Sequence, residues 1–200
     1  MSKVLLAGLA AALFATPVLA QSDAAGGDVP LGGPQVPGVC LLSQQAVFAN
    51  AKVGLAAAAR LKALTQEAQA GVDAERTQIE TDAKALQAQK GGLKADDFAA
   101  RQKALAERVQ ALQEHASLRS REIEATREKA LQRIAVEARP VVDKAYTDHR
   151  CGLLVDRNVV LGGNMAGDLT AAVVQGLDAR ITTITFDREV LPETPTSAAQ

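Results

Sequence analysis

The chain has 200 residues, a formal net charge of −1 at pH 7, two cysteines and only 2% aromatic residues. A chain this close to neutral lacks the concentrated basic face of a dedicated nucleic-acid binder, so we predict no nucleic-acid partner. The sequence contains no zinc-type spacing of cysteine and histidine, no phosphate-binding glycine loop and no nucleophile elbow. We therefore predict that the protein is not an enzyme and uses no cofactor or metal.

Residues 1–20 carry one lysine, Lys3, then an apolar stretch that ends in small residues before the polar Gln21. This order is typical of a secretory signal peptide, with cleavage predicted after Ala20. The alternative is an uncleaved membrane helix, but the apolar stretch is short for a span of about 20 residues. We expect the mature chain to be exported to a bacterial periplasm, where it is either soluble or in peripheral contact with membrane lipid.

Composition separates the ends of the chain from its folded part. Residues 21–37 are rich in glycine, proline and alanine and offer little to bury, so we predict a disordered linker there. Residues 191–200 have the composition of a disordered tail. Residues 38–50 are assigned to a small body, as its first strand, Val39–Leu42, followed by a short helix.

Residues 51–149 read as two long helices broken at Gly91–Gly92. Apolar residues recur three, four or seven positions apart in both, which predicts an antiparallel helical hairpin paired as a coiled coil, with its tip at 91–95. The span has too few large side chains for a globular core, so we expect an arm. The seam residues are Leu55, Ala58, Leu61, Leu64, Ala68, Val72, Ile79 and Leu86, then Phe98, Leu105, Val109, Leu112, Ala116, Ile123, Ala130, Ile134, Ala138 and Val141.

Polar residues interrupt this seam. Glu75 and Asp82 occupy seam positions in the first helix, and Arg119 and Thr126 interrupt the second. We interpret the thinning toward the tip as a softer distal arm. His115, which lies among charged residues, is expected to be solvated.

Two residues are predicted as flex points of the arm. Gly71 lies inside the first helix and costs about 1 kcal/mol relative to alanine. It either allows bending or admits a close neighbour. Pro140 removes a backbone amide from the second helix, which predicts a kink near Arg139.

The predicted tip contains the glycine pair and two apolar residues. Gly91–Gly92 are expected to reverse the chain with positive φ angles, and Asp96 or Asp97 to cap the second helix. Leu93 and Phe98 have two interpretations. They either close the turn as a hydrophobic staple or form a contact point for an apolar client.

After residue 150 the pattern changes to short apolar runs, and we assign residues 150–190 to the body. Residues 151–155 and 159–161 predict a β-hairpin with a polar turn, beside Val39–Leu42 as a third strand. Asp168 is expected to cap a short helix with Thr170 as its helper, and 181–186 to add an edge strand. So few strands make a small core, which predicts oligomerisation. The fold class is α+β, mainly α.

Cys40 and Cys151 are the two cysteines of the chain, so each is the only possible intrachain disulfide partner of the other. An exported chain with two cysteines allows one disulfide. The alternative is a pair of buried thiols, since adjacent strands do not guarantee the required geometry. The sequence leaves both open.

At this point the chain resembles a known family, the Skp/OmpH periplasmic chaperones. The resemblance covers nearly the whole mature chain and rests on the leader, the helical hairpin and the segments 45–48, 52–54, 152–156, 159–161 and 168–170. It implies a jellyfish-shaped homotrimer whose strands form the body and whose three arms enclose a cavity. Members of the family hold unfolded outer-membrane β-barrel proteins in transit without ATP.

The leading hypothesis is therefore a periplasmic holdase chaperone with unfolded outer-membrane proteins as clients. The alternative is a structural coiled-coil spacer or adaptor of the cell envelope, which would bridge fixed partners with the same helices. A rigid spacer should have strong apolar residues throughout its seam, and the thinning at Glu75 and Asp82 favours the chaperone.

Overall fold

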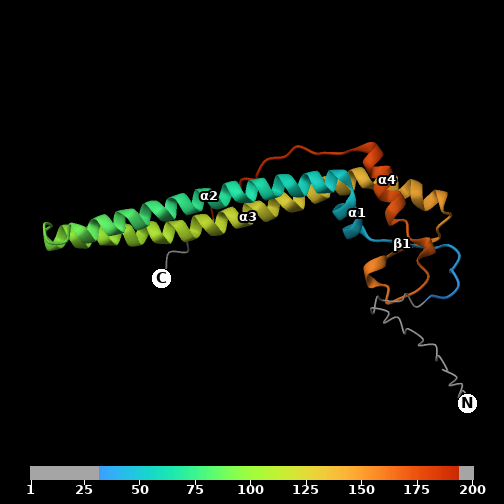
Figure 1. The fold of residues 1–200 in the computed structure, drawn as a ribbon, viewed down its shortest axis with the longest axis horizontal. Helices are drawn as coiled ribbons and strands as arrows, with labels where there is room; N and C mark the ends of the chain where they lie inside the picture. The colour runs from blue at the N-terminus through green and yellow to red at the C-terminus, as the bar shows by residue number, and fades with distance from the viewer. Residues whose placement is uncertain (1–31, 194–200) are drawn as a thin grey trace, which may run out of the picture.

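Two long helices make up most of the molecule. In the computed structural model, which describes residues 32–193, α2 (Lys52–Ala88) and α3 (Ala95–Asp148) lie side by side and extend away from a small body (Figure 1). The predicted signal peptide at 1–20 and most of the predicted linker lie outside the described residues, as does the end of the predicted tail. Within residues 32–193, none of the helices has the length and apolar character to cross a membrane.

The body contains a two-stranded parallel sheet. Strand β1 (Val39–Leu42) pairs with β2 (Leu153–Asp156), with Val39 opposite Leu153. The predicted β-hairpin is therefore wrong. Asp156 accepts a hydrogen bond from the amide of Asn158 at 2.9 Å, and Arg157–Val159 form a 3₁₀ turn that leads the chain out of the sheet. The arm itself is the long crossover that a parallel pair requires.

The other connections of the body are short. Helix α1 (Gln44–Asn50) follows β1, a second 3₁₀ turn covers Met165–Gly167, and α4 (Thr170–Arg180) follows it. The predicted edge strand at 181–186 is also wrong, because no strand forms there. After α4 the chain instead runs extended along the arm, where it is drawn in red over α2 (Figure 1).

The core lies where these elements meet the base of the arm. Its fully buried side chains include Val53 from α2, Ile134 from α3 and Leu169, Val173 and Leu177 at and within α4. Helix α2 starts directly after α1, and a β carbon at Gly54 would lie 1.8 Å from the carbonyl oxygen of Phe48. The sharp corner between α1 and α2 therefore needs glycine at position 54.

The predicted seam is confirmed in the middle and distal parts of the arm, where Leu64, Val72, Ile79, Leu86 and Leu112 are buried. Leu55, Ala58 and Val109 are corrections, because 55% of the surface of Leu55 and 42% of that of Val109 are exposed and Ala58 is exposed as well. At the base, α2 turns Val53, Gly54 and Ala57 inward to meet the body as well as α3, which leaves Leu55 on the outer side.

The turn at the tip differs from the prediction. Gly91 and Gly92 do not have positive φ angles, and the chain reverses through short turns, such as the hydrogen bond from the Gly92 amide to the Gln89 carbonyl at 2.9 Å. Lys94 precedes the first residue of α3, so neither Asp96 nor Asp97 is the cap. Both aspartates lie in the first turn, where their charges still favour the positive end of the helix dipole.

Candidate functional site

The body exposes apolar side chains around its sheet. Leu153 on β2 is 54% exposed, Val159 is 71% exposed, and Leu161 is fully exposed. Strand β2 pairs only with β1, so within the described residues its second edge has no strand beside it. An unpaired strand edge next to exposed apolar residues is a typical site for association with another chain.

A hollow of about 250 Å³ lies beside this sheet. Its lining is mostly apolar and comes from β1, α1, α3, β2 and α4, including Leu42, Phe48, Val142, Leu154 and Val173. Within residues 32–193, no group of three or more histidine, cysteine, aspartate or glutamate residues could hold a metal ion. The lining of the hollow therefore favours hydrophobic contact.

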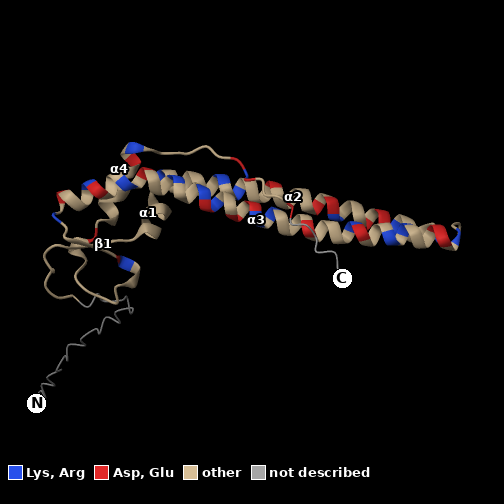
Figure 2. Ribbon diagram, turned by 180° about the vertical axis from the view of Figure 1, so that it is seen from behind, with Lys and Arg blue, Asp and Glu red and all other residues tan. Residues whose placement is uncertain are grey.

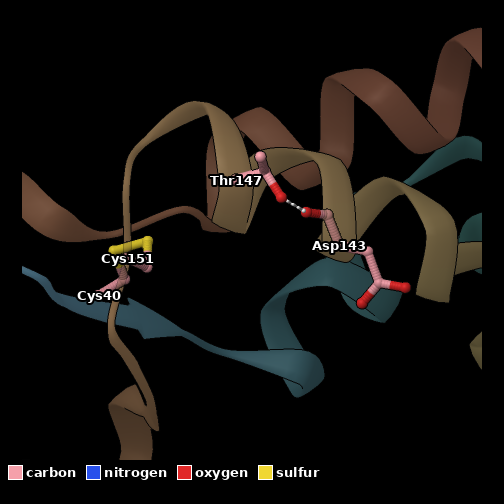
Figure 3. Close-up of a disulfide and its surroundings, with 4 residues drawn as sticks. All are labelled: Cys40, Asp143, Thr147 and Cys151. Carbon is pink, nitrogen blue, oxygen red and sulfur yellow. Dashed lines mark hydrogen bonds between the residues drawn. A yellow bond between two sulfur atoms is a disulfide. The ribbon is translucent and has the colours of Figure 1, made fainter.

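Cys40 and Cys151 are joined by a disulfide in the structure, with their Cα atoms 5.7 Å apart (Figure 3). Cys40 lies in β1, and Cys151 lies between the end of α3 and β2. The amides of Gly152 and Leu153 both donate to the Gly38 carbonyl, at 2.7 and 2.9 Å. The bridge and these bonds hold the returning end of the arm against the start of the body.

Asp168 organises the turn before α4. Its carboxylate accepts hydrogen bonds from the Thr170 amide at 2.9 Å and from Arg157 at 2.8 Å. Burial alone would raise the pKa of Asp168, but the hydrogen bonds from Thr170 and the Arg157 guanidinium outweigh it and hold the pKa below its usual range. Thr170 in turn accepts from the Ser43 amide at 3.0 Å, which ties this turn to β1.

The polar residues that interrupt the seam form partnered contacts between the helices. Glu75 on α2 accepts from His115 Nδ1 on α3 at 2.9 Å, and Asp82 pairs with Arg108 at 2.6 Å. The hydrogen bond from Arg108, only partly offset by desolvation, lowers the pKa of Asp82. His115 is half-buried and hydrogen-bonded to Glu75 on the other helix of the arm. This corrects the expectation that it is solvated.

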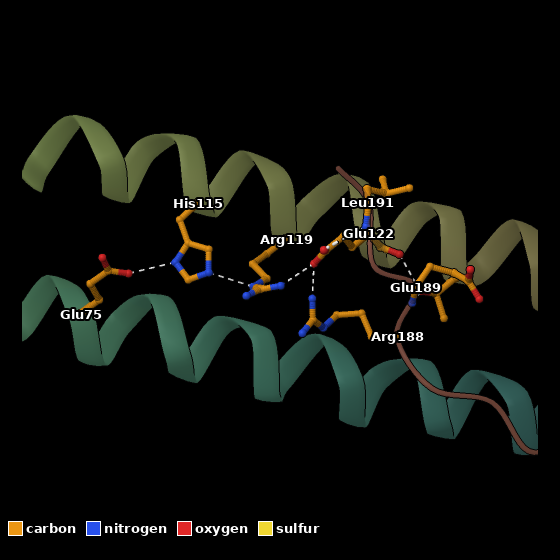
Figure 4. Close-up of polar contacts among 8 residues, drawn as sticks. Glu75, His115, Arg119, Glu122, Arg188, Glu189 and Leu191 are labelled. Carbon is orange, nitrogen blue, oxygen red and sulfur yellow. Dashed lines mark hydrogen bonds and ion pairs between the residues drawn. The ribbon is translucent and has the colours of Figure 1, made fainter. Parts of the chain in front are cut away.

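A chain of polar contacts continues from His115 toward the base (Figure 4). Arg119 donates through Nε to His115 Nε2 at 2.9 Å and through a terminal nitrogen to Glu122 at 2.7 Å. Glu122 is only 1% exposed and also pairs with Arg188, which comes from beyond α4. Burial acts to raise the pKa of Glu122, but the bonds from Arg119 and the Leu191 amide and the charge of Arg188 lower it overall.

The segment that supplies Arg188 is the chief feature that sequence reasoning missed. Residues 181–191, called the strap below, lie extended along the arm and contact both of its helices (Figure 1). The prediction placed an edge strand at 181–186, assigned the residues up to 190 to the body and began the tail at 191. The signal that could have located the strap is Thr126, whose polar side chain takes a seam position and accepts a hydrogen bond from the Glu189 amide of the strap.

At the arm tip, the structure places Leu93 and Phe98 on either side of the start of α3, both half-exposed. They flank the helix start at the positions of a hydrophobic staple, just before the cap and in the first turn. The ammonium group of Lys90 lies 5.7 Å from the centre of the Phe98 ring. A role of these residues in client contact stays a prediction.

The two predicted flex points both lie inside continuous helices. A β carbon at Gly71 would meet nothing within 4 Å, so the interpretation that this glycine admits a close neighbour is wrong. Pro140 is exposed, and α3 continues past it to Asp148. Bending at either residue stays a prediction.

Charged residues of both signs are interspersed along the arm, without a continuous patch of one sign in the view of Figure 2. Several of them pair across elements, as Arg180 does with Glu137 at 2.9 Å. Interspersed charges of both signs are typical of the solvated faces of long helices.

Comparison with known proteins places this architecture in a family. The model of the family described as outer membrane protein (OmpH-like) matches residues 38–177. A crystal structure from Caulobacter crescentus CB15, described as a proposed OmpH-like outer membrane chaperone, is 40% identical, with a TM-score of 0.75. The comparison covers 81% of this chain and 96% of that one. No curated protein matches the chain. With its two long helices, its small sheet and this match over most of its length, the chain belongs to the OmpH-like family of outer membrane proteins.

Proposed function

We propose that the protein is a periplasmic, ATP-independent holdase chaperone, which binds unfolded outer-membrane proteins and prevents their aggregation in transit. The observation that carries the proposal is the long α2–α3 pair, which extends away from the body and has charged residues of both signs dispersed along it (Figure 2). The similarity to the Caulobacter chaperone supports the same class. Export through a cleaved signal peptide at 1–20 is part of the proposal, and N-terminal sequencing of the mature protein should then begin at Gln21.

The proposed working form is a homotrimer. The open edge of β2 and the exposed Leu153, Val159 and Leu161 give each body an apolar surface that another copy can cover. A two-stranded sheet is marginal by itself, so strands contributed by several copies would stabilise one another. Three arms on such a body would enclose a cavity in which an unfolded chain is kept apart from others.

The arms suit transient binding. Weak apolar contacts dispersed among charges give many small contributions and no single tight one, so a client remains mobile while it is held. This mode of binding requires no nucleotide, because release follows from the weakness of each contact.

The test is suppression of aggregation without nucleotide. A urea-denatured outer-membrane β-barrel protein is diluted into buffer with the chaperone, and light scattering is followed. We expect scattering to fall to the baseline near one oligomer per client, whereas a folded soluble protein of similar size has no effect. Unchanged aggregation at several-fold molar excess would contradict the proposal.

The alternative function is a structural spacer or adaptor of the cell envelope. The contacts Glu75–His115 and Asp82–Arg108 favour it, because they fasten α2 to α3 where the apolar seam is interrupted. A spacer would bind its partners in their folded state. Equal binding of a folded and an unfolded outer-membrane protein would therefore favour the spacer over the chaperone.

A further inference from the structure

Side chains of the arm hold the strap through hydrogen bonds to the backbone of the strap. Arg60 on α2 donates to the Phe186 carbonyl at 3.2 Å, and Arg133 on α3 donates to the Thr185 carbonyl at 3.0 Å. Further along, the amide of Glu189 donates to Thr126 Oγ1 at 2.9 Å. Side chains that bond backbone groups recognise an extended chain whatever its sequence.

The far end of the strap is also bonded through its backbone. The Leu191 amide donates to Glu122 Oε1 at 3.3 Å, while the other carboxylate oxygen of Glu122 pairs with Arg188. If the strap leaves, Glu122 keeps its bond from Arg119 at 2.7 Å, so the buried carboxylate still has a cationic partner. The surface under the strap can therefore exist with another occupant.

Residues 184–187 of the strap present alternate side chains to the arm. Ile184 is 6% exposed and belongs to the core cluster at the base of the arm, with Phe186 packed against the same cluster. Thr185 and Asp187, which alternate with them, are exposed, and the Asp187 side chain is 93% exposed while it pairs with Arg60. Over these four residues apolar and polar side chains alternate, as they do along a membrane-spanning strand of an outer-membrane β-barrel, whereas further along the polar Arg188 faces the arm and the apolar Val190 is exposed.

The strap also lies beyond the part of the chain that the family model matches, which ends at residue 177. Most of the ion pairs that hold it are exposed, including Arg60–Asp187 and Lys129–Glu189, so they add little to its binding. The strap is attached to the arm mainly by the backbone contacts, by Ile184 and by Arg188.

From this geometry we propose that the strap is a built-in competitor of the client, and that the surface it covers on α2 and α3 binds extended segments of unfolded β-barrel proteins. The inference rests on the proposed chaperone function and names its client site. A client segment replaces the strap by offering its own carbonyls to Arg60 and Arg133 and its amides to Thr126 and Glu122. The strap covers this site while no client is present.

Hydrogen exchange on the wild-type protein tests the inference. The amides of Glu189 and Leu191 are bonded to the arm and should exchange slowly without client. With an unfolded β-barrel protein bound, exchange of the segment 185–191 should accelerate by about tenfold or more, whereas α4 serves as the unchanged control. Light scattering of the same sample reports whether the client stays soluble.

The outcomes separate the two proposals. A soluble client with unchanged or slower exchange of the strap overturns the inference and leaves the chaperone function intact. A client that precipitates overturns the chaperone function and the inference together.

A matched pair of variants gives a second test. Arg188→Ala removes the strap residue that pairs with Glu122, and Val190→Ser changes a strap residue that is 82% exposed. Because the strap is then a weaker competitor, the Arg188→Ala variant should bind unfolded client several-fold more tightly than wild type. Val190→Ser should bind client as wild type does. Equal or weaker client binding by Arg188→Ala would show that the strap does not compete.

Discussion

At the scale of single residues, two glycines of the same helix have opposite roles. Gly54 leaves room for the carbonyl of Phe48, at the corner where α1 meets α2, and any side chain there would collide with backbone. Gly71 has open space around its β position and only adds backbone freedom to an otherwise regular helix. Burial and neighbours therefore decide what each glycine does, although both look alike as interruptions of a helical pattern.

Alanine at each position should separate these roles. Gly54→Ala is expected to lower the free energy of unfolding by about 1–3 kcal/mol or more, because backbone must shift to avoid the clash. Gly71→Ala is expected to raise the helix stability by about 1 kcal/mol. Urea denaturation followed by circular dichroism measures both. A stabilising Gly54→Ala would show that the corner is not as close as the structure has it.

The disulfide between Cys40 and Cys151 closes a loop with a sequence separation of 111 residues. Replacing both cysteines with serine should lower the free energy of unfolding by up to about 4–5 kcal/mol on the loop-entropy model. The first check is a thiol count on denatured, non-reduced protein from the periplasm. Two free thiols per chain would rule out the bridge, and replacing both cysteines should then lower the free energy of unfolding far less.

At the scale of elements, the helices follow from local information, and their partners do not. Seam residues such as Leu64 and Ile79 recur at a spacing that any helix pairing requires, so both helices could be predicted closely. Glu75 looked like a weak seam position because its partner, His115, lies 40 residues away. Thr126 meets the strap 63 residues later. Periodicity contains no signal for such distant polar partners.

The sheet was mispredicted for a related reason. The run at 151–161 has the composition of a hairpin, but the Asx-type hydrogen bond of Asp156 redirects the chain before a second strand can form. Strand β2 then pairs with β1 in parallel, because α3 returns the chain beside Gly38. Which strand lies next to β2 is decided by the end of a 54-residue helix, and no local pattern contains that information.

The buried carboxylate of Glu122 makes the link between strap and arm sensitive to acid. Its pKa is lowered in the folded state, so its contribution to stability is complete above its unfolded pKa, near 4.5, and is lost as pH falls through the lower folded value. Glu122→Gln should lower the free energy of unfolding by about 3 kcal/mol at pH 7. The stability of this variant should also fall less steeply than that of wild type as the pH decreases. Urea midpoints measured from pH 7 to pH 3 check this. Parallel wild-type and variant profiles would show that Glu122 is not the acid-sensitive group.

At the scale of the whole molecule, the shape of the arm and the exposed surface of the body both favour association of several copies. The buried residues of the distal arm form only a narrow seam, with Val72, Ile79 and Leu112 as its cluster, and the body exposes Leu153 and Leu161 beside a strand edge that has no partner among the described residues. Several copies that share one body would cover this surface and hold the arms around a common space. The strap then controls how much of each arm is open to a client.

The most direct measurement is sedimentation velocity of the mature protein, alone and with one outer-membrane β-barrel protein in its unfolded and folded forms. We predict a trimer alone, a discrete soluble complex with the unfolded form, and no complex with the folded form. A well-folded monomer that binds neither form, or an oligomer that binds both equally, would contradict this prediction.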